Sequence, residues 1–173
     1  MEPELVLPSL KYKNSFLEAL AEQDDGPANR LEGEKYEKFQ NYFEAFLVYK
    51  KDEREGKNLP EGWVQQTTYW LVAGEKFIGK ADIRHVLNEH LMTMGGHIGY
   101  AIRPSERHKG YGSLALKLAL PKAREIGIEK ALLTCNKTNE ASRRIIEKNG
   151  GVFENEVFGE DGNIKLRFWV PTA

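Results

Sequence analysis

The chain has 173 residues, of which 40% are hydrophobic and 29% are charged, and its formal net charge at pH 7 is −1. Such a balanced charge gives no sign of a nucleic-acid or membrane-surface partner, and no apolar run reaches the roughly 20 residues that span a bilayer. The single cysteine, Cys135, rules out an intrachain disulfide. The first residues show no basic segment followed by an apolar run, as a secretion signal would. We therefore expect one domain over residues 1–173, located in the cytoplasm.

The N-terminal part, residues 1–66, is predicted to form an arm and two helices. The arm contains Leu5, Val6 and Leu7, which could add an edge strand to a sheet. Residues 11–23 have apolar side chains at helical spacing, and residues 36–55 repeat aromatic side chains every three or four positions. These aromatic residues are Tyr36, Phe39, Tyr42, Phe43, Phe46 and Tyr49. They favour packing against a sheet, and the alternative is one wall of a substrate pocket.

The remainder, residues 67–173, is predicted to contain the core sheet. The predicted strands cover residues 67–73, 77–87, 97–103, 130–135, 152–158 and 164–170. One helix should follow Gly112, and another should begin with Asn139 as its N-cap residue. The order is two antiparallel strands, two strand–helix units and a closing hairpin, without an internal repeat.

The stretch 99–113 holds the clearest functional signal. It begins as a strand, passes through a polar loop with Gly110 and Gly112, and continues as a helix. Backbone N–H groups at such a loop, next to the positive end of a helix dipole, form a ready site for phosphate oxygens. A plain strand-to-helix turn capped by glycine is the alternative, because short glycine patterns have many false matches.

Two segments resemble the GCN5-related N-acetyltransferase (GNAT) family. Residues 107–112 read Arg-x-x-Gly-x-Gly after a strand with Ile-Gly-Tyr, which is similar to the family's acetyl-CoA loop. Further on, Asn139-Glu140-Ala141-Ser142 and Glu147-Lys148-Asn149-Gly150 resemble its second motif. The resemblance covers about residues 98–152, and residues 1–66 gain no support from it.

The resemblance implies an α/β (α+β) fold with a mixed, mostly antiparallel central sheet that is flanked by helices and splayed between the fourth and fifth core strands. It implies an N-acetyltransferase that moves an acetyl group from acetyl-CoA to a primary amine by direct transfer in a ternary complex. The alternative is an acetyl-CoA-binding sensor or interaction module without catalysis. The expected partners are acetyl-CoA and an amine acceptor, and no nucleic acid or membrane is expected to bind. The protein is expected to be a monomer or a homodimer.

By the same resemblance, the cofactor site combines the glycine loop with the ends of two strands and a helix start. The implied cofactor-binding residues are Ala101, Ile102, Arg107, His108, Lys109, Gly110, Tyr111, Gly112, Ser113, Asn136, Asn139 and Ser142. Backbone around Tyr100 to Ile102 would pair with the pantetheine arm as an extra strand would. The ribose phosphate could be reached by Lys109, Lys137, Arg143 and Arg144, each of which could equally be a solvated surface charge.

Two residues are candidates for proton transfer. His97 stands where the family often has a glutamate that acts as a base through water, and an imidazole suits proton transfer at neutral pH. A hydrogen-bonded structural histidine is the alternative. The family's usual tyrosine acid aligns with Ile146, so Tyr100 is the candidate replacement, together with Tyr111 or water.

Two other groups are predicted to have no catalytic role. His85 and His90 resemble an inverted zinc-peptidase motif, but the spacing has one residue too many, so we expect no metal site. Cys135 lies in an apolar strand, which favours a buried, inert thiol over a nucleophile.

Overall fold

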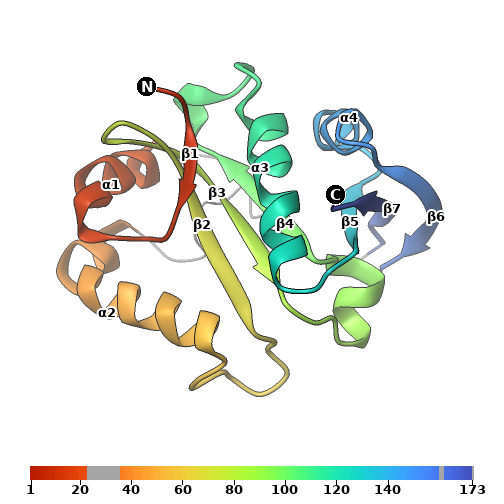
Figure 1. The fold of residues 1–173 in the computed structure, drawn as a ribbon, viewed down its shortest axis with the longest axis horizontal. Coiled ribbons are helices and arrows are strands. Elements are labelled where there is room, and N and C mark those ends of the chain that lie inside the picture. Colours follow the sequence, from red (N-terminus) through yellow and green to blue (C-terminus); the bar gives the residue numbers. More distant parts are fainter. Residues whose placement is uncertain (23–35, 160–161, 173) are drawn as a thin grey trace.

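The computed structural model describes residues 1–22, 36–159 and 162–172 (Figure 1). Its first sheet has the strand order β1-β2-β3-β4, and all neighbouring strands are antiparallel. These strands are β1 (Glu4–Val6), β2 (Gln66–Ala73), β3 (Lys76–Arg84) and β4 (Ile98–Ile102). The N-terminal arm is the edge strand β1, in which Leu5 pairs with Leu71, as predicted.

The second sheet has the order β5-β7-β6 and is also antiparallel. It consists of β5 (Lys130–Asn136), β6 (Val152–Phe158) and β7 (Ile164–Pro171). The two sheets meet where the short segment before β4 touches β5, through an isolated bridge between Gly96 and Leu133. The central sheet is thus divided between β4 and β5, which confirms the predicted splay.

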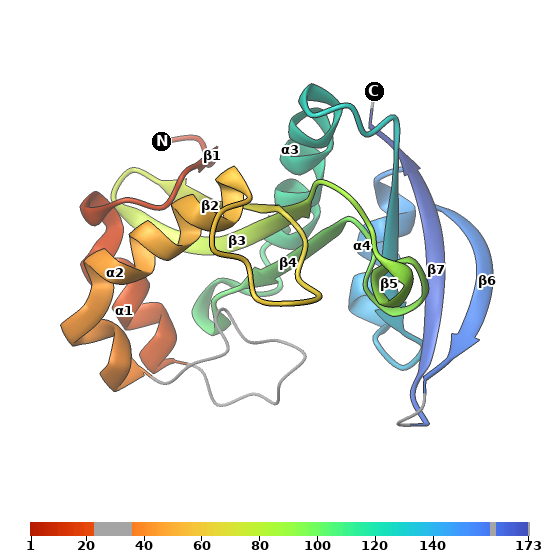
Figure 2. The same ribbon diagram turned by 90° about the horizontal axis from the view of Figure 1, so that it is seen from below.

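Helices cover the first sheet on both faces (Figure 2). α1 (Lys13–Ala21) and α2 (Tyr36–Glu55) lie against one face, and α3 (Tyr111–Glu125) lies against the other. α4 (Glu140–Lys148) packs beside α3 and next to β5. Short helical turns at Leu10–Tyr12, Leu91–Gly95 and Pro104–Glu106 connect these elements. Within the described ranges, no helix is both long and apolar enough to cross a membrane.

The core consists of two main clusters on opposite faces of the first sheet. Under α1 and α2 lies an aromatic cluster, which we define as Phe16, Phe43, Phe46, Trp70 and Phe77. Phe16 is its centre, because its ring stacks on Trp70 at 4.7 Å and meets Phe77 edge-on at 5.2 Å. Phe43 and Phe46 are therefore core residues, in agreement with the packing interpretation of the second helix.

The second cluster fills the space between both sheets, α3 and α4. It contains aliphatic side chains from each of these elements, including Ile83, Leu116, Leu133 and Ile146. In the strands, side chains alternate between the two faces, so the residues next to Ile83 and Leu133 point to the opposite face. The predicted fold class is confirmed: an antiparallel sheet system, flanked by helices, opens between β4 and β5.

Candidate functional site

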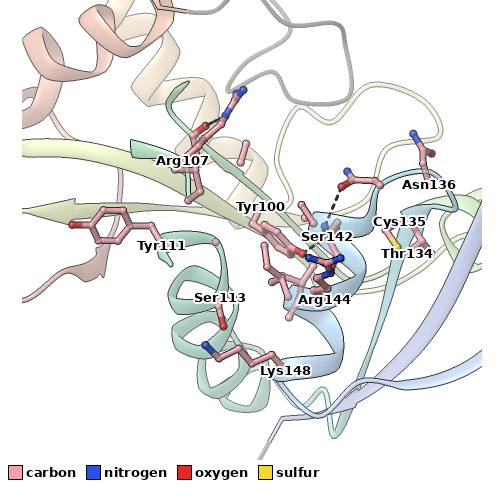
Figure 3. A pocket seen from close by; sticks show the side chains of 18 of the residues that line it. Tyr100, Arg107, Tyr111, Ser113, Thr134, Cys135, Asn136, Ser142, Arg144 and Lys148 are labelled. Carbon is pink, nitrogen blue, oxygen red and sulfur yellow. Dashed lines mark hydrogen bonds between the residues drawn. The ribbon is translucent and has the colours of Figure 1, made fainter. Parts of the chain in front are cut away.

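A cavity of about 660 Å³ lies where β4 and β5 diverge (Figure 3). Its walls come from both strands, from the loop before α3 and from the N-terminal half of α4. One end of the cavity is closed by backbone contact, since the N–H of His97 donates to the carbonyl of Leu132 at 2.6 Å. From this link the strands separate, and β4 leads into the glycine loop at the other end.

The glycine loop connects β4 to α3, and two of its residues have left-handed backbone conformations. Gly110 has φ +85° and serves as N-cap of α3, and His108 has φ +62°. A Cβ at Gly110 would meet no atom within 4 Å, whereas a Cβ at Gly112 would lie 2.7 Å from the Ile145 side chain. Gly110 therefore leaves the helix N-terminus open, and Gly112 allows α4 to approach α3.

Charged side chains fix the start of this loop. The Nε of Arg107 donates to the carbonyl of Ile102 at 3.1 Å, which ties the loop to the end of β4. Glu106 accepts hydrogen bonds from Lys76 and Lys109, and the Lys76 bond in particular lowers the pKa of its carboxyl. Glu106 thus stays ionised but is balanced by two ammonium groups, which limits its repulsion of a phosphate.

The start of α4 is built as the sequence predicts. The side chain of Asn139 accepts from the backbone N–H of Ser142 at 3.0 Å, as an N-cap does. The Tyr100 hydroxyl lies 2.9 Å from Ser142 Oγ, so it joins β4 to α4 across the cavity wall. Burial raises the pKa of Tyr100 to about 12, so its hydroxyl is protonated at neutral pH.

Most residues that the sequence assigned to the cofactor line this cavity. They are Ala101, Ile102, Arg107, His108, Gly110, Tyr111, Gly112, Ser113, Asn136, Asn139 and Ser142. Lys109 is outside the lining, and its ammonium group pairs with Glu106 at 3.1 Å. Of the other candidates for the ribose phosphate, Arg144 lines the cavity, while Lys137 and Arg143 are outside it. All three form ion pairs with neighbouring glutamates.

Further cavity residues were missed by sequence reasoning. Among them are three cations: Arg84 on β3, Lys148 at the end of α4 and Lys165 on β7. Lys148 belongs to the segment 147–150 that suggested the family, so its place had a signal in the sequence. Arg84 and Lys165 had none, because their position depends on how distant strands are brought together.

His97 is not part of the cavity lining. Its Nδ1 accepts a hydrogen bond from the backbone N–H of Leu132 at 2.9 Å, and its ring lies 6.5 Å from the Trp169 ring. Burial, and secondarily the charge of Arg84, lowers the pKa of His97. The imidazole is therefore neutral at neutral pH, with Nδ1 engaged by β5 and its proton on Nε2.

Two residues near the cavity, Ile146 and Cys135, are buried packing residues. Ile146 is fully buried in the cluster between the sheets, so the position of the family's usual tyrosine holds a core side chain. Cys135 is 4% exposed, and burial raises the pKa of its thiol. A buried, neutral thiol is a poor nucleophile, although Cys135 also contributes to the cavity lining.

A family model described as the acetyltransferase (GNAT) domain matches residues 17–152. The chain therefore belongs to the GNAT family of acetyltransferases. The match extends the resemblance seen at residues 98–152 through most of the N-terminal helices. A comparison with curated proteins by sequence gives no significant match.

Solved structures with this fold include several acetyltransferases. The ribosomal L7/L12 alpha-N-protein acetyltransferase RimL, in complex with coenzyme A, has a TM-score of 0.69 at 13% identity, covering 98% of this chain and 93% of that one. A chimera of spermidine N-acetyltransferase SpeG from Vibrio cholerae and hSSAT gives 0.64 at 13% identity, covering 99% and 97%. The microcin C7 self-immunity acetyltransferase MccE, with acetyl-CoA and AMP, gives 0.66 at 14% identity, covering 98% and 92%. At these identities the likeness establishes the fold.

Proposed function

We propose that this protein is an N-acetyltransferase that transfers the acetyl group of acetyl-CoA directly to a primary amine. The observation that carries the proposal is the cavity itself, which extends from the N-terminus of α3 to the space between β4 and β5. Membership of the GNAT family supports acetyl transfer, and structural neighbours bind CoA or acetyl-CoA. We further infer that the chain forms one domain and acts in the cytoplasm, which its single free cysteine supports.

The residues of the cavity fit the chemistry of acetyl-CoA. At the α3 end, the open backbone at Gly110, the helix N-terminus and Lys148 suit the negative phosphates. Between the strands, Asn136 has a buried Oδ1 atom that finds no hydrogen-bond partner among the described residues. An amide N–H of the pantetheine arm would satisfy this acceptor, since unpaired buried polar atoms are costly. Ala101 and Ile102 offer backbone groups along the same wall.

For the proton transfers, we propose that Tyr100 supplies a protonated hydroxyl near the leaving sulfur. Its high pKa keeps the proton on the oxygen, and the neighbouring Ser142 hydroxyl orients it. His97 remains the candidate base, but its Nδ1 is occupied by the N–H of Leu132. To accept a proton at that atom, the imidazole would have to give up its hydrogen bond to β5.

The direct test follows free thiol release from acetyl-CoA with a panel of primary amines, and measures acetyl-CoA binding by calorimetry. We expect micromolar to millimolar binding and turnover with at least one class of amine. Tyr100→Phe should reduce kcat by about 100-fold if the hydroxyl delivers a proton, with little change in acetyl-CoA affinity. A protein that binds acetyl-CoA but acetylates no amine would contradict the proposal.

A further inference from the structure

The cations that line the cavity fall on two sides of the sheet system. Arg144 and Lys148 come from α4, which packs beside α3, and Arg107 comes from the start of the glycine loop. Under the proposed function these positive charges would bind the phosphates of acetyl-CoA at the α3 end of the cavity. Two further cations, Arg84 and Lys165, are not explained by the phosphates.

Strand alternation places Arg84 and Lys165 on the opposite face. On β3 and β7, their neighbours Ile83 and Leu166 point into the core under α3 and α4. Successive side chains of a strand point to opposite faces, so Arg84 and Lys165 are directed away from those helices. Both residues line the cavity. Arg84 does so at the closed end, where its backbone N–H donates to the carbonyl of His97, whereas Lys165 lies opposite Asn136, four residues along β5 from Leu132. An acceptor that meets the uncharged thioester near the closed end would have Arg84 beside it and Lys165 further along the cavity.

Arg84 is held rigidly in this position. Its Nη1 donates to the carbonyl of Gly96 at 2.9 Å, next to the link between the two sheets. Burial lowers the pKa of its guanidinium, and the nearby Asp82 opposes that shift. Asp82 is already engaged, because it forms an ion pair with Lys80 at 2.9 Å and accepts from the Thr68 hydroxyl at 2.7 Å. A guanidinium has five N–H donors, so Arg84 retains donors for a ligand.

Lys165 differs from the cations around it. Its partner across the ladder is Asn136. Lys137 directly follows β5, and Arg167 lies two residues further along β7. Lys137 pairs with Glu156 at 2.8 Å, and Arg167 pairs with Glu154 at 2.7 Å. Lys165, which is half-buried, forms no ion pair with any residue of the described part of the chain. Among the described residues that line the cavity, Glu106 is the only acidic one, and it lies at the phosphate end.

We propose that the acceptor is a primary amine that carries a carboxylate or a phosphate, that Lys165 binds this anionic group, and that Arg84 adds positive charge at the closed end of the cavity. The inference rests on the proposed acetyl transfer and adds its substrate class. The same two cations would lower the pKa of the acceptor ammonium by like-charge repulsion, which favours the neutral amine that attacks the thioester. A polycation such as spermidine, the substrate in the name of one structural neighbour, would be repelled.

The test compares acceptors that differ mainly in charge. Three pairs serve: β-alanine with 1,3-diaminopropane, O-phosphoethanolamine with ethanolamine, and the peptide amides Ala-Glu-Glu and Ala-Lys-Lys. We expect kcat/KM to be at least about tenfold higher for the anionic member of one or more pairs, the size of a charge-assisted hydrogen bond. The pair that responds identifies the source of the anionic group. Equal rates within every pair, or a preference for the cationic members, would overturn the inference.

Variants of Lys165 assign the effect to this site. Lys165→Gln should lower kcat/KM for the anionic acceptor by about tenfold while KM for acetyl-CoA stays unchanged, and Lys165→Glu should shift the preference toward the diamine. Lys137→Gln is the matched control, because Lys137 is close in the structure but exposed and already paired with Glu156. Melting temperatures of all three proteins should agree.

The outcomes separate the two proposals. If calorimetry shows acetyl-CoA binding but no anionic amine is acetylated, the acceptor inference is wrong and the cofactor site stands. If acetyl-CoA does not bind, the proposed function itself is wrong. If Lys165→Gln raises KM for acetyl-CoA instead, Lys165 belongs to the cofactor site, which also overturns the inference.

Discussion

The two faces of the first sheet carry different kinds of side chain for different purposes. On one face, α1 and α2 enclose the aromatic cluster, whose rings contact one another, and no described side chain of either helix lines the cavity. On the other face and at its edge, the glycine loop, α3 and α4 surround a cavity that polar and small residues line. Large rings thus hold the N-terminal helices in place, while backbone groups and short side chains leave room for a ligand.

The largest effect should come from the aromatic face. Phe43→Ala should reduce the free energy of unfolding by about 3–4 kcal/mol, because Phe43 is 2% exposed and its removal leaves a cavity. The neighbouring Tyr42→Ala is the control, since Tyr42 is 65% exposed and should change stability by about 0.5 kcal/mol or less. Urea denaturation measures both, and KM for acetyl-CoA should stay constant. An altered KM for the amine acceptor with normal stability would make α2 a wall of the acceptor pocket after all.

At the glycine loop, by contrast, we expect a substitution to weaken acetyl-CoA binding. Gly110→Asp places a carboxylate at the open N-terminus of α3 and should weaken acetyl-CoA binding by about 100-fold, as measured by calorimetry. Gly127→Asp is a strict control, because Gly127 also has positive φ, at +90°, and equally open surroundings, but lies outside the cavity. Both variants should lose similar stability from backbone strain. Equal affinities in the two variants would remove the loop from the binding site.

A smaller effect is expected at Lys148. Lys148→Gln should weaken acetyl-CoA binding by about three- to tenfold, because one cation near the phosphates is lost. The salt dependence of the dissociation constant should also decrease. Lys117→Gln removes an exposed charge from α3 at a position outside the cavity and should have no effect. If both variants bind equally well, the phosphates do not lie near the end of α4.

The smallest effect concerns the pH dependence of stability at His97. Burial and Arg84 lower the pKa of the folded-state imidazole, so the unfolded chain binds more protons in the range between the lowered and the ordinary pKa. The free energy of unfolding should therefore fall as pH decreases through that range. His97→Gln should flatten this slope, and the exposed His90→Gln should keep it. If the free energy of unfolding changes with pH in the same way for His97→Gln and wild type, the hydrogen bond between His97 and Leu132 does not depend on the protonation of His97.

Local signals allowed much of the site to be predicted. Gly110 lies at a left-handed position and Asn139 caps α4, and in both cases the residue type and its immediate neighbours determine the structure. The bounds of α2, Tyr36–Glu55, also agree with the aromatic spacing. That spacing could not decide whether the rings face a core or a ligand, because the answer depends on Trp70 in a strand further along the chain.

What could not be predicted depends on distant residues. His97 received a catalytic interpretation from its place beside β4, but its Nδ1 is engaged by Leu132, which lies 35 residues away in the chain. Arg84 and Lys165 likewise have no local pattern, and only the order of the strands brings them to one cavity. Gly112 lines the cavity, and it also makes room for Ile145 of α4, a packing role that depends on a residue 33 positions away.

The backbone link between Gly96 and Leu133 holds the diverging strands β4 and β5 together at one end, so a relative rotation of the two strands would pivot about this point. β4 has five residues, so its last residue lies about 13 Å from its first. A rotation of about 5° at the pivot would move that end by more than 1 Å, but would barely change distances beside Gly96. In the proposed acetyl transfer, such a rotation would change the width of the cavity at the glycine loop and leave the separation of β4 and β5 beside Gly96 nearly constant.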